Sequence, residues 1–278
     1  MPIRLTSAFP FLSLEPRPFV PVVRISGAIG MRSPLSPPRG TSEIARALDR
    51  AFAVRKAPAV VLLVNSPGGS PVQSHMLHRR VRALAEEKET PVIAVVEDLA
   101  ASGGYMVACA ADEIIADPAS VVGSIGVVSA GFGFADLLDR LGVERRVHTA
   151  GNRKAMLDPF RPERPEDVAH LEQIQAEIHD HFIALVKARR GDRLSTEDDL
   201  FSGLFWSGQR ARELGLVDGL GTLHDTVRAR YGADMPIRLI EPARRPLLRR
   251  LVFGFGEAAA LGALTAAEER MHWLRYRL

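Results

Sequence analysis

Apolar runs and amphipathic segments alternate along the chain and predict a regular succession of strands and helices. Short runs with the length and β-branched content of buried strands cover residues 22–25, 60–64, 92–96 and 121–128. Segments that begin at Thr41 or span 71–88 and 168–190 repeat their apolar positions with a helical period. Because strands that alternate with helices form right-handed βαβ units, we expect an α/β fold with a mostly parallel sheet.

The two ends of the chain differ from this pattern. Residues 1–21 are rich in proline and predict an extended arm, whereas residues 22–240 hold the regular elements. Residues 241–278 predict a basic amphipathic helix. Such a helix can lie on a membrane surface, dock on a partner subunit or cover the chain's own core. Shorter elements expected in the middle region are strands at 114–115, 144–149 and 237–240 and helices at 132–141, 208–215 and 222–231.

The composition is that of an ordinary globular protein. The chain has 278 residues, enough to bury a sizeable core, and 46% of them are hydrophobic. The net charge of +3 is slight, so we expect no nucleic-acid partner. The single cysteine, Cys109, excludes an intrachain disulfide, and its apolar surroundings predict a core position. The sequence shows no transmembrane run and no signal peptide, so we expect a cytoplasmic protein.

A serine after the 92–96 strand is the first candidate for chemistry. The sequence A-A-S-G-G-Y places Ser102 at a strand-to-helix turn, followed by two glycines. Helix N-termini carry unpaired N–H groups and partial positive charge, which stabilise charge that develops on a substrate oxygen. Ser102 is therefore a nucleophile in one interpretation and an ordinary helix N-cap in the other.

A serine nucleophile needs a base, and the sequence offers two kinds. His148, at the end of the expected 144–149 strand, is the histidine best placed for a Ser-His-Asp arrangement. Lys154, in G-N-R-K-A, lies in the loop that follows. A lysine base has to be desolvated, because an ordinary lysine side chain with a pKa of about 10.4 is protonated at neutral pH. The alternative interpretation of Lys154 is a solvated loop residue.

Negative charge on a reacting carbonyl oxygen requires two converging donors. The N–H of Gly103, at the helix start, is one candidate. The second is expected from N-S-P-G-G at residues 65–69, where glycine permits backbone angles closed to other residues. Both turns follow parallel strands and lie at the same edge of the sheet, so Gly68 can approach Ser102. P-G-G is otherwise a plain turn, and it lacks the Lys-Ser/Thr of a phosphate loop.

Four motifs in this order, N-S-P-G-G, A-A-S-G-G-Y, G-S-I-G-V and G-x-x-K, resemble the signal peptide peptidase A family of serine proteases. The resemblance implies a Ser-Lys dyad on a fold of the ClpP/crotonase type, built from repeated ββα and βαβ units. It implies Ser102 as nucleophile, Lys154 as general base and Ser124 as the serine that orients the lysine. Gly68 and Gly103 match the oxyanion positions, and no metal or other cofactor is implied.

The resemblance covers roughly residues 22–221 and also implies substrates and partners. It implies a serine endopeptidase that cleaves leftover signal peptides or other apolar peptides, in a groove expected between Gly69 and Tyr105. Short members form ring-like octamers with sites shared between subunits, so we expect a homo-oligomer in which Lys154 serves Ser102 of the adjacent protomer. Most members carry an N-terminal membrane anchor; here, peripheral contact through the C-terminal helix would replace it.

Two other functions share these features. A crotonase-type acyl-CoA enzyme uses the same fold and paired backbone donors on a thioester, with carboxylates in its pocket. The nearest carboxylates here are Glu97 and Asp98, directly before the Ser102 turn, and we expect both to be structural. The second alternative is a non-catalytic assembly scaffold of the same fold.

Overall fold

The structure, a computed structural model, describes residues 17–30 and 41–241. The expected C-terminal helix and most of the expected N-terminal arm therefore lie outside the described residues. The first strand, β1, spans Val20–Ser26. It begins two residues before the expected start of this strand at residue 22, because Val20 already pairs with Ile237.

One sheet of eight strands forms the centre of the described structure. Its order is β6-β5-β3-β2-β1-β8, and β4 and β7 continue from β3 on a second path. Every pairing is parallel except that of β5 with β6, which confirms the expected mostly parallel sheet. The strands after β1 are β2 (Val60–Ser66), β3 (Val92–Ala101), β4 (Glu113–Ala116), β5 (Val121–Gly123), β6 (Phe205–Ser207), β7 (Gly219–Leu220) and β8 (Ile237–Leu239).

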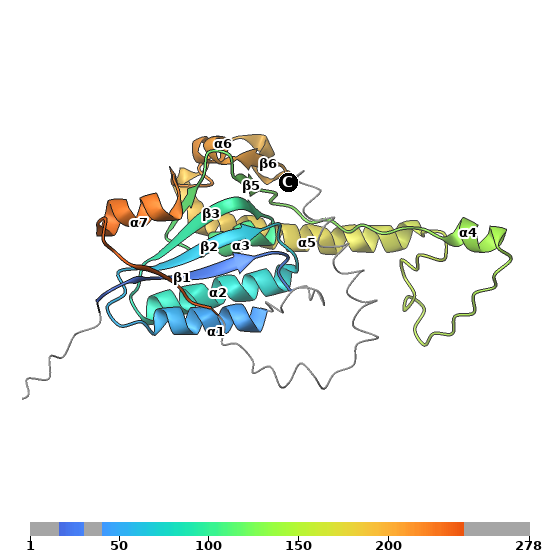
Figure 1. Ribbon diagram of the computed structural model, residues 1–278. Coiled ribbons are helices and arrows are strands. Elements are labelled where there is room, and N and C mark those ends of the chain that lie inside the picture. The colour runs from blue at the N-terminus through green and yellow to red at the C-terminus, as the bar shows by residue number, and fades with distance from the viewer. Residues whose placement is uncertain (1–16, 31–40, 242–278) are drawn as a thin grey trace, which may run out of the picture.

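Helices cover both faces of this sheet (Figure 1). They are α1 (Thr41–Phe52), α2 (Pro71–Glu87), α3 (Gly103–Ala108), α4 (Ala135–Arg140), α5 (Pro165–Arg190), α6 (Gly208–Glu213) and α7 (Leu223–Tyr231), with short 3₁₀ turns at Gly191–Arg193 and Asp198–Phe201. On the face of α1, α2 and α3, buried strand residues such as Leu62 and Val64 join one core. On the other face, Val61 and Leu63 pack in a second core with Val227 of α7. Because both faces are covered, β2 reads as a continuous apolar run.

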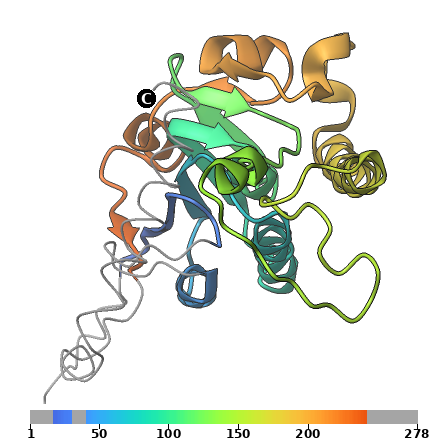
Figure 2. The same ribbon diagram turned by 90° about the vertical axis from the view of Figure 1, so that its right-hand side faces the viewer.

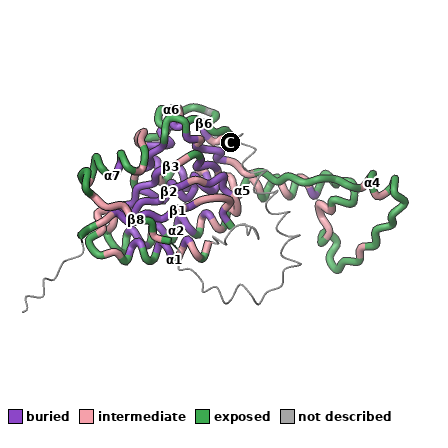
Figure 3. Tube along the Cα trace, viewed as in Figure 1, coloured by how far each residue is buried: buried purple, intermediate pink, exposed green. Residues whose placement is uncertain are grey.

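A long extension leaves this body. Residues 127–164, which we call the projection, run out beside α5 and turn at its outer end (Figures 1 and 2). Apart from Asp167, the buried residues of α5 lie between Phe182 and Arg190, near the sheet. Figure 3 shows the interior of the body as buried and the projection as mostly exposed. Large apolar side chains exposed on the projection are Val128, Phe132, Phe134, Leu137, Leu141, Val143 and Phe160.

The strand expected at 144–149 is wrong. These residues lie in the projection, are mostly exposed and pair with no described strand. Their side chains suit a strand, but a strand also needs a neighbour for its N–H and C=O groups, and no described segment supplies one. The expected 121–128 strand ends earlier, at Gly123, because Ser124 has a φ of 53° and so leaves the extended conformation of a strand.

Candidate active site

The turn between β3 and α3 holds Ser102 in a strained backbone conformation. Its φ of 50° and ψ of −122° are rare for a residue with a side chain and cost about 1–3 kcal/mol. The N–H of Ser102 donates to Gly123 O at 2.8 Å, and its carbonyl accepts from Met106 N–H at 3.0 Å. The same strand–turn–helix arrangement exposes the nucleophilic serine of α/β-hydrolases at the edge of their sheet.

The hydroxyl of Ser102 is not used as a helix cap. Ser102 occupies the N-cap position of α3, but its side chain makes no capping hydrogen bond. All other residues from Leu99 to Ala111 are buried, whereas Ser102 is half-buried. The N-cap interpretation therefore holds for the position of Ser102 but not for its side chain, and the turn places a half-buried serine in an otherwise buried segment.

Glycines allow the turn after β2 to touch the start of α3. A Cβ atom on Gly68 would lie 2.8 Å from Ser102 Cβ, and one on Gly104 would lie 2.5 Å from the carbonyl oxygen of Ser66. Gly68 also has a φ of 104°, which favours glycine. The expected approach of Gly68 to Ser102 is confirmed.

Two backbone donors face this turn without an acceptor among the described residues. One is the N–H of Gly103, at the first position of α3. The other is the N–H of Gly69: Ile29 bonds to the carbonyl of Gly68 at 2.7 Å and to the N–H of Ser70 at 2.9 Å, so the amide between them points away from Ile29. The N–H of Gly68 itself donates to Ser66 Oγ at 3.2 Å. The predicted donor, Gly68, thus already has an acceptor. Gly69 was not predicted from the sequence, because the Ile29 pairing that orients its amide carries no local signal.

Ser124 lies beside Ser102. Ala101 pairs with Gly123 in the parallel register of β3 and β5, so the serines that follow them are neighbours at the same edge of the sheet. Ser124 is buried and, like Ser102, has a positive φ, here 53°. These two serines thus meet although 22 positions separate them in the sequence.

The two candidate bases lie elsewhere. Lys154 and His148 belong to the projection, and both are exposed. The backbone N–H of Lys154 donates to Gly151 O at 3.2 Å within a local turn. The segment between α4 and α5 lies at the outer end of α5, away from the β3–α3 turn (Figure 1). Within one chain, the structure does not bring either base to Ser102.

Tyr105 does not line a substrate groove. Its side chain is fully buried, and its hydroxyl donates to Leu216 O at 2.8 Å. Burial raises the pKa of this phenol well above its ordinary value. The expectation of a groove between Gly69 and Tyr105 is wrong for Tyr105, because the short helix α3 turns that side chain into the core. Gly69 is half-buried, at the edge of the turn.

The carboxylates that precede the turn are engaged. Glu97 accepts a hydrogen bond from Arg24 Nη1 at 2.9 Å, and Asp98 accepts one from Asn65 Nδ2 at 2.7 Å. Both were expected to be structural, and these contacts agree with that role. The carboxylates nearest the turn, which a crotonase-type enzyme would use, are thus each paired with another side chain.

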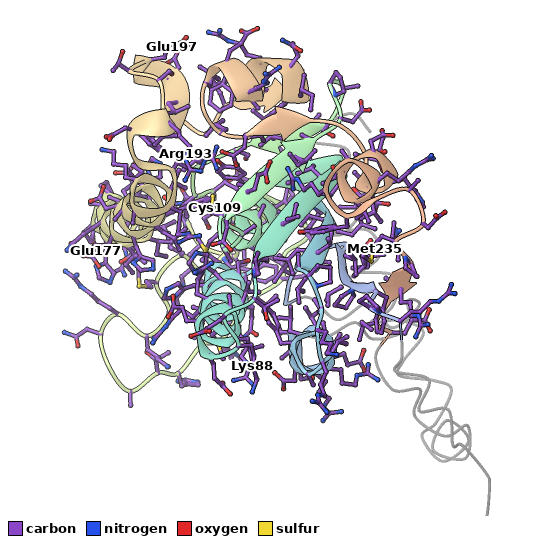
Figure 4. All side chains as sticks on the ribbon, turned by 90° about the vertical axis from the view of Figure 1, so that its left-hand side faces the viewer. Lys88, Cys109, Glu177, Arg193, Glu197 and Met235 are labelled. Carbon is purple, nitrogen blue, oxygen red and sulfur yellow. The ribbon has the colours of Figure 1, made fainter. Side chains whose placement is uncertain are left out.

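The far end of α3 is held by arginines. Arg189 Nε donates to Cys109 O at 2.9 Å, and Arg82 Nη1 donates to Ala110 O at 3.1 Å. Cys109 lies among packed side chains (Figure 4), and burial raises the pKa of its thiol to about 12. Its expected core position is confirmed, and the thiol is unsuited to nucleophilic attack.

In the described parts of the chain, no group of three or more His, Cys, Asp or Glu side chains is arranged to hold a metal ion.

Comparison with known proteins places the chain among peptidases. The sequence profile of peptidase family S49 matches residues 84–232, which include Ser102, Ser124 and Lys154. A chloroplastic protein of Arabidopsis thaliana, named serine protease SPPA, is 31% identical over 224 residues, which are 78% of this chain and 33% of that protein.

A second relative has a different name. A protein of Brucella abortus (strain 2308), named Na(+)/H(+) antiporter NhaA, is 51% identical over 273 residues. The match takes in 93% of this chain but only 37% of that protein, so this chain spans little more than a third of its length. Among the helices of the described residues, none is both long and apolar enough to cross a membrane.

A solved structure of a membrane-bound stomatin-specific protease, in complex with a substrate peptide, superposes with a TM-score of 0.50. The superposition covers 90% of this chain and 99% of that one, at 14% sequence identity. This likeness concerns the fold, which is of the expected ClpP/crotonase type.

Proposed function

Since this chain belongs to peptidase family S49, we propose that it is a serine endopeptidase with Ser102 as its nucleophile and Lys154 as its general base. The observation that carries the proposal is the turn at Ser102. There, a strained serine offers an uncapped hydroxyl next to backbone donors that have no acceptor in the described structure. A serine that only capped α3 would need neither the strain nor the free donors.

The proposed oxyanion site consists of the N–H groups of Gly103 and Gly69. Gly69 and Gly103 directly follow Gly68 and Ser102, the two residues that touch, and both N–H groups lack an acceptor among the described residues. The N–H of Gly68 is the weaker candidate for the second donor, because Ser66 Oγ already accepts from it. Each donor of this kind contributes about 3–4 kcal/mol to the stabilisation of the transition state.

The lysine is proposed to come from a neighbouring copy of the chain. In its own chain Lys154 is exposed on the projection, which also exposes Phe132 by 76% and Leu141 by 65%. Apolar surface of this kind marks an interaction site. Burial of the projection against a second copy would also desolvate Lys154, as a lysine base requires. Ser124 would then orient the incoming amine from beside Ser102.

The reaction proceeds through an acyl-enzyme. Neutral Lys154 takes the proton of Ser102 as Oγ bonds to the peptide carbonyl carbon, and the carbonyl electron pair moves to the oxygen held by the two backbone donors. The intermediate collapses, the C–N bond breaks, and the lysine gives its proton to the leaving amine. Water, deprotonated by Lys154, then hydrolyses the serine ester and restores Ser102. The proposed substrates are peptides with small or apolar side chains next to the cut, leftover signal peptides among them.

A fluorophosphonate label tests the nucleophile. We expect the wild-type protein to be labelled and to cleave casein, and Ser102→Ala to do neither. Lys154→Ala should lose cleavage, whereas Arg153→Ala, the adjacent exposed cation, should keep it. Labelling of Ser102→Ala at the wild-type level would exclude Ser102 as the nucleophile.

Mixed oligomers test the shared site. Ser102→Ala and Lys154→Ala chains are each inactive alone, but an oligomer that contains both pairs an intact serine with an intact lysine from the other chain. We expect activity to return in this mixture. A wild-type protein that is fully active as a monomer in gel filtration would refute the shared site and leave the proposed nucleophile standing.

A further inference from the structure

The inner end of α5 is held by a buried ion pair. Arg190, the last residue of the helix, is only 2% exposed. Its Nη1 and Nη2 atoms donate to the two carboxylate oxygens of Asp218 at 2.8 and 3.0 Å, and its Nε donates to Gly215 O at 2.9 Å. Arg193, just beyond the helix (Figure 4), adds a third contact to Asp218 at 3.0 Å. The Nε, Nη1 and Nη2 donors of Arg190 belong to one planar guanidinium group, so their three hydrogen bonds fix the orientation of that group as well as its position.

The same turn of α5 contacts the nucleophile helix. Arg189, next to Arg190, donates to the carbonyls of Cys109 and Ala111 at the end of α3, each at 2.9 Å. The loop at residues 215–218, which Arg190 contacts, also accepts a hydrogen bond from the Tyr105 hydroxyl, at Leu216 O. Hydrogen bonds therefore connect α3 and the inner end of α5 to each other and to this one loop.

His179 Nε2 lies 3.0 Å from Ile125 O, and the part of α5 that precedes His179 has no comparable hydrogen bond or ion pair with the body among the described residues. The only buried residue of α5 before Phe182 is Asp167, which pairs with Arg164 at the outer end rather than with the body. Figure 2 looks almost along α5 and shows it beside the sheet rather than under it. The helix has 26 residues and is about 39 Å long at 1.5 Å per residue, so a tilt of about 10° at its root moves the outer end by about 7 Å. Proton transfer tolerates far less, because the two atoms must come within about 3 Å.

We propose that Arg190 and Asp218 are positioning residues that set the direction of α5 and thereby the place where the projection presents Lys154 to a neighbouring Ser102. This inference rests on the proposed shared site. Neither side chain touches the reacting atoms. Each acts through α5: the orientation of the buried Arg190 guanidinium sets the direction of the helix, and the direction of the helix sets the position of the Lys154 amine.

Arg190→Lys tests the proposal, because lysine keeps the charge but cannot make the two parallel contacts to a carboxylate. We expect cleavage of casein to fall at least tenfold, while gel filtration still shows the oligomer. Arg210→Lys, in an exposed pair with Glu213, is the matched control and should stay within twofold of wild type. If Arg190→Lys does not fold, Asp218→Asn replaces it, since the amide keeps the shape and one acceptor.

Mixed oligomers separate positioning from a general structural role. A chain with Arg190→Lys keeps its own Ser102 turn but misplaces its own Lys154. A Ser102→Ala chain, inactive alone, supplies a correctly placed lysine. We expect their mixture to regain activity, as the Ser102→Ala and Lys154→Ala mixture does.

Three results would overturn the proposal. They are wild-type activity of Arg190→Lys, a lack of rescue by Ser102→Ala while the reference mixture is active, or an inactive reference mixture. The third result alone also refutes the shared site, and fluorophosphonate labelling then shows whether Ser102 remains the nucleophile.

Discussion

Acid should destabilise this protein through one buried histidine. His78 of α2 is 8% exposed, and neither of its ring nitrogens has a hydrogen-bond partner among the described residues. Cationic groups face His78 from Arg189 on α5 and from His75 and Arg82 on α2, and each lowers its pKa. The Cys109 carbonyl, just after α3, raises the pKa of His78 less than these groups lower it, and it already accepts a hydrogen bond from Arg189. Burial, first, and the Arg189 charge, second, lower the pKa of His78 to about 4.

The direction and size of the effect follow from the two pKa values. In the unfolded chain the pKa of His78 is 6.5, so between pH 6.5 and 4 the unfolded chain binds a proton at His78 and the folded protein does not. The contribution of neutral His78 to the free energy of unfolding is therefore fully present above pH 6.5. It is lost as the pH falls toward 4, by about 1.4 kcal/mol per pH unit. The total loss attributable to His78 at pH 4 is about 3 kcal/mol.

The measurement is urea unfolding between pH 4 and 7.5 at one protein concentration, for wild type and His78→Leu. Leucine removes the titrating ring and leaves no unpaired nitrogen. The difference between their free energies of unfolding cancels the other titrating groups, and we expect it to change by about 3 kcal/mol across this range. His224→Leu, on the exposed surface of α7, is the control. A His78→Leu difference that stays constant with pH would refute the reasoning.

Three further predictions concern the core, the site and the projection. Tyr105→Phe leaves the buried Leu216 carbonyl unpaired and should cost about 1–3 kcal/mol of unfolding free energy while KM for a peptide stays unchanged; a large rise in KM would return Tyr105 to the substrate groove. Gly104→Ala places a methyl group 2.5 Å from a backbone oxygen, so we expect about 3 kcal/mol of destabilisation and loss of fluorophosphonate labelling, whereas normal labelling would show that α3 can shift freely. Phe132→Asp, on the projection, should shift gel filtration toward smaller species and reduce cleavage, with the surface variant Arg210→Lys unchanged; an intact, active oligomer would show that this face is not an interface.

The sequence by itself determined the parts that depend on local pattern. The helical period from Thr41 and the apolar run at 60–64 predict α1 and β2, since periodicity and burial report directly on local conformation. The S-G-G sequence likewise predicts the turn at Ser102. In each case the physical cause, a buried face or a flexible backbone, lies within a few residues of the signal.

Tertiary structure alone decided what those elements touch. The Ile29 pairing directs the Gly69 amide, the turn of α3 buries Tyr105, and the lack of a described neighbour leaves 144–149 without a strand. Lys154 shows the same limit most clearly. Its motif predicts a base, but Lys154 is exposed on the projection, and the segment between α4 and α5 lies at the outer end of α5, away from the β3–α3 turn (Figure 1). Contacts between residues far apart in sequence depend on the path of the whole chain, and local composition contains no record of that path.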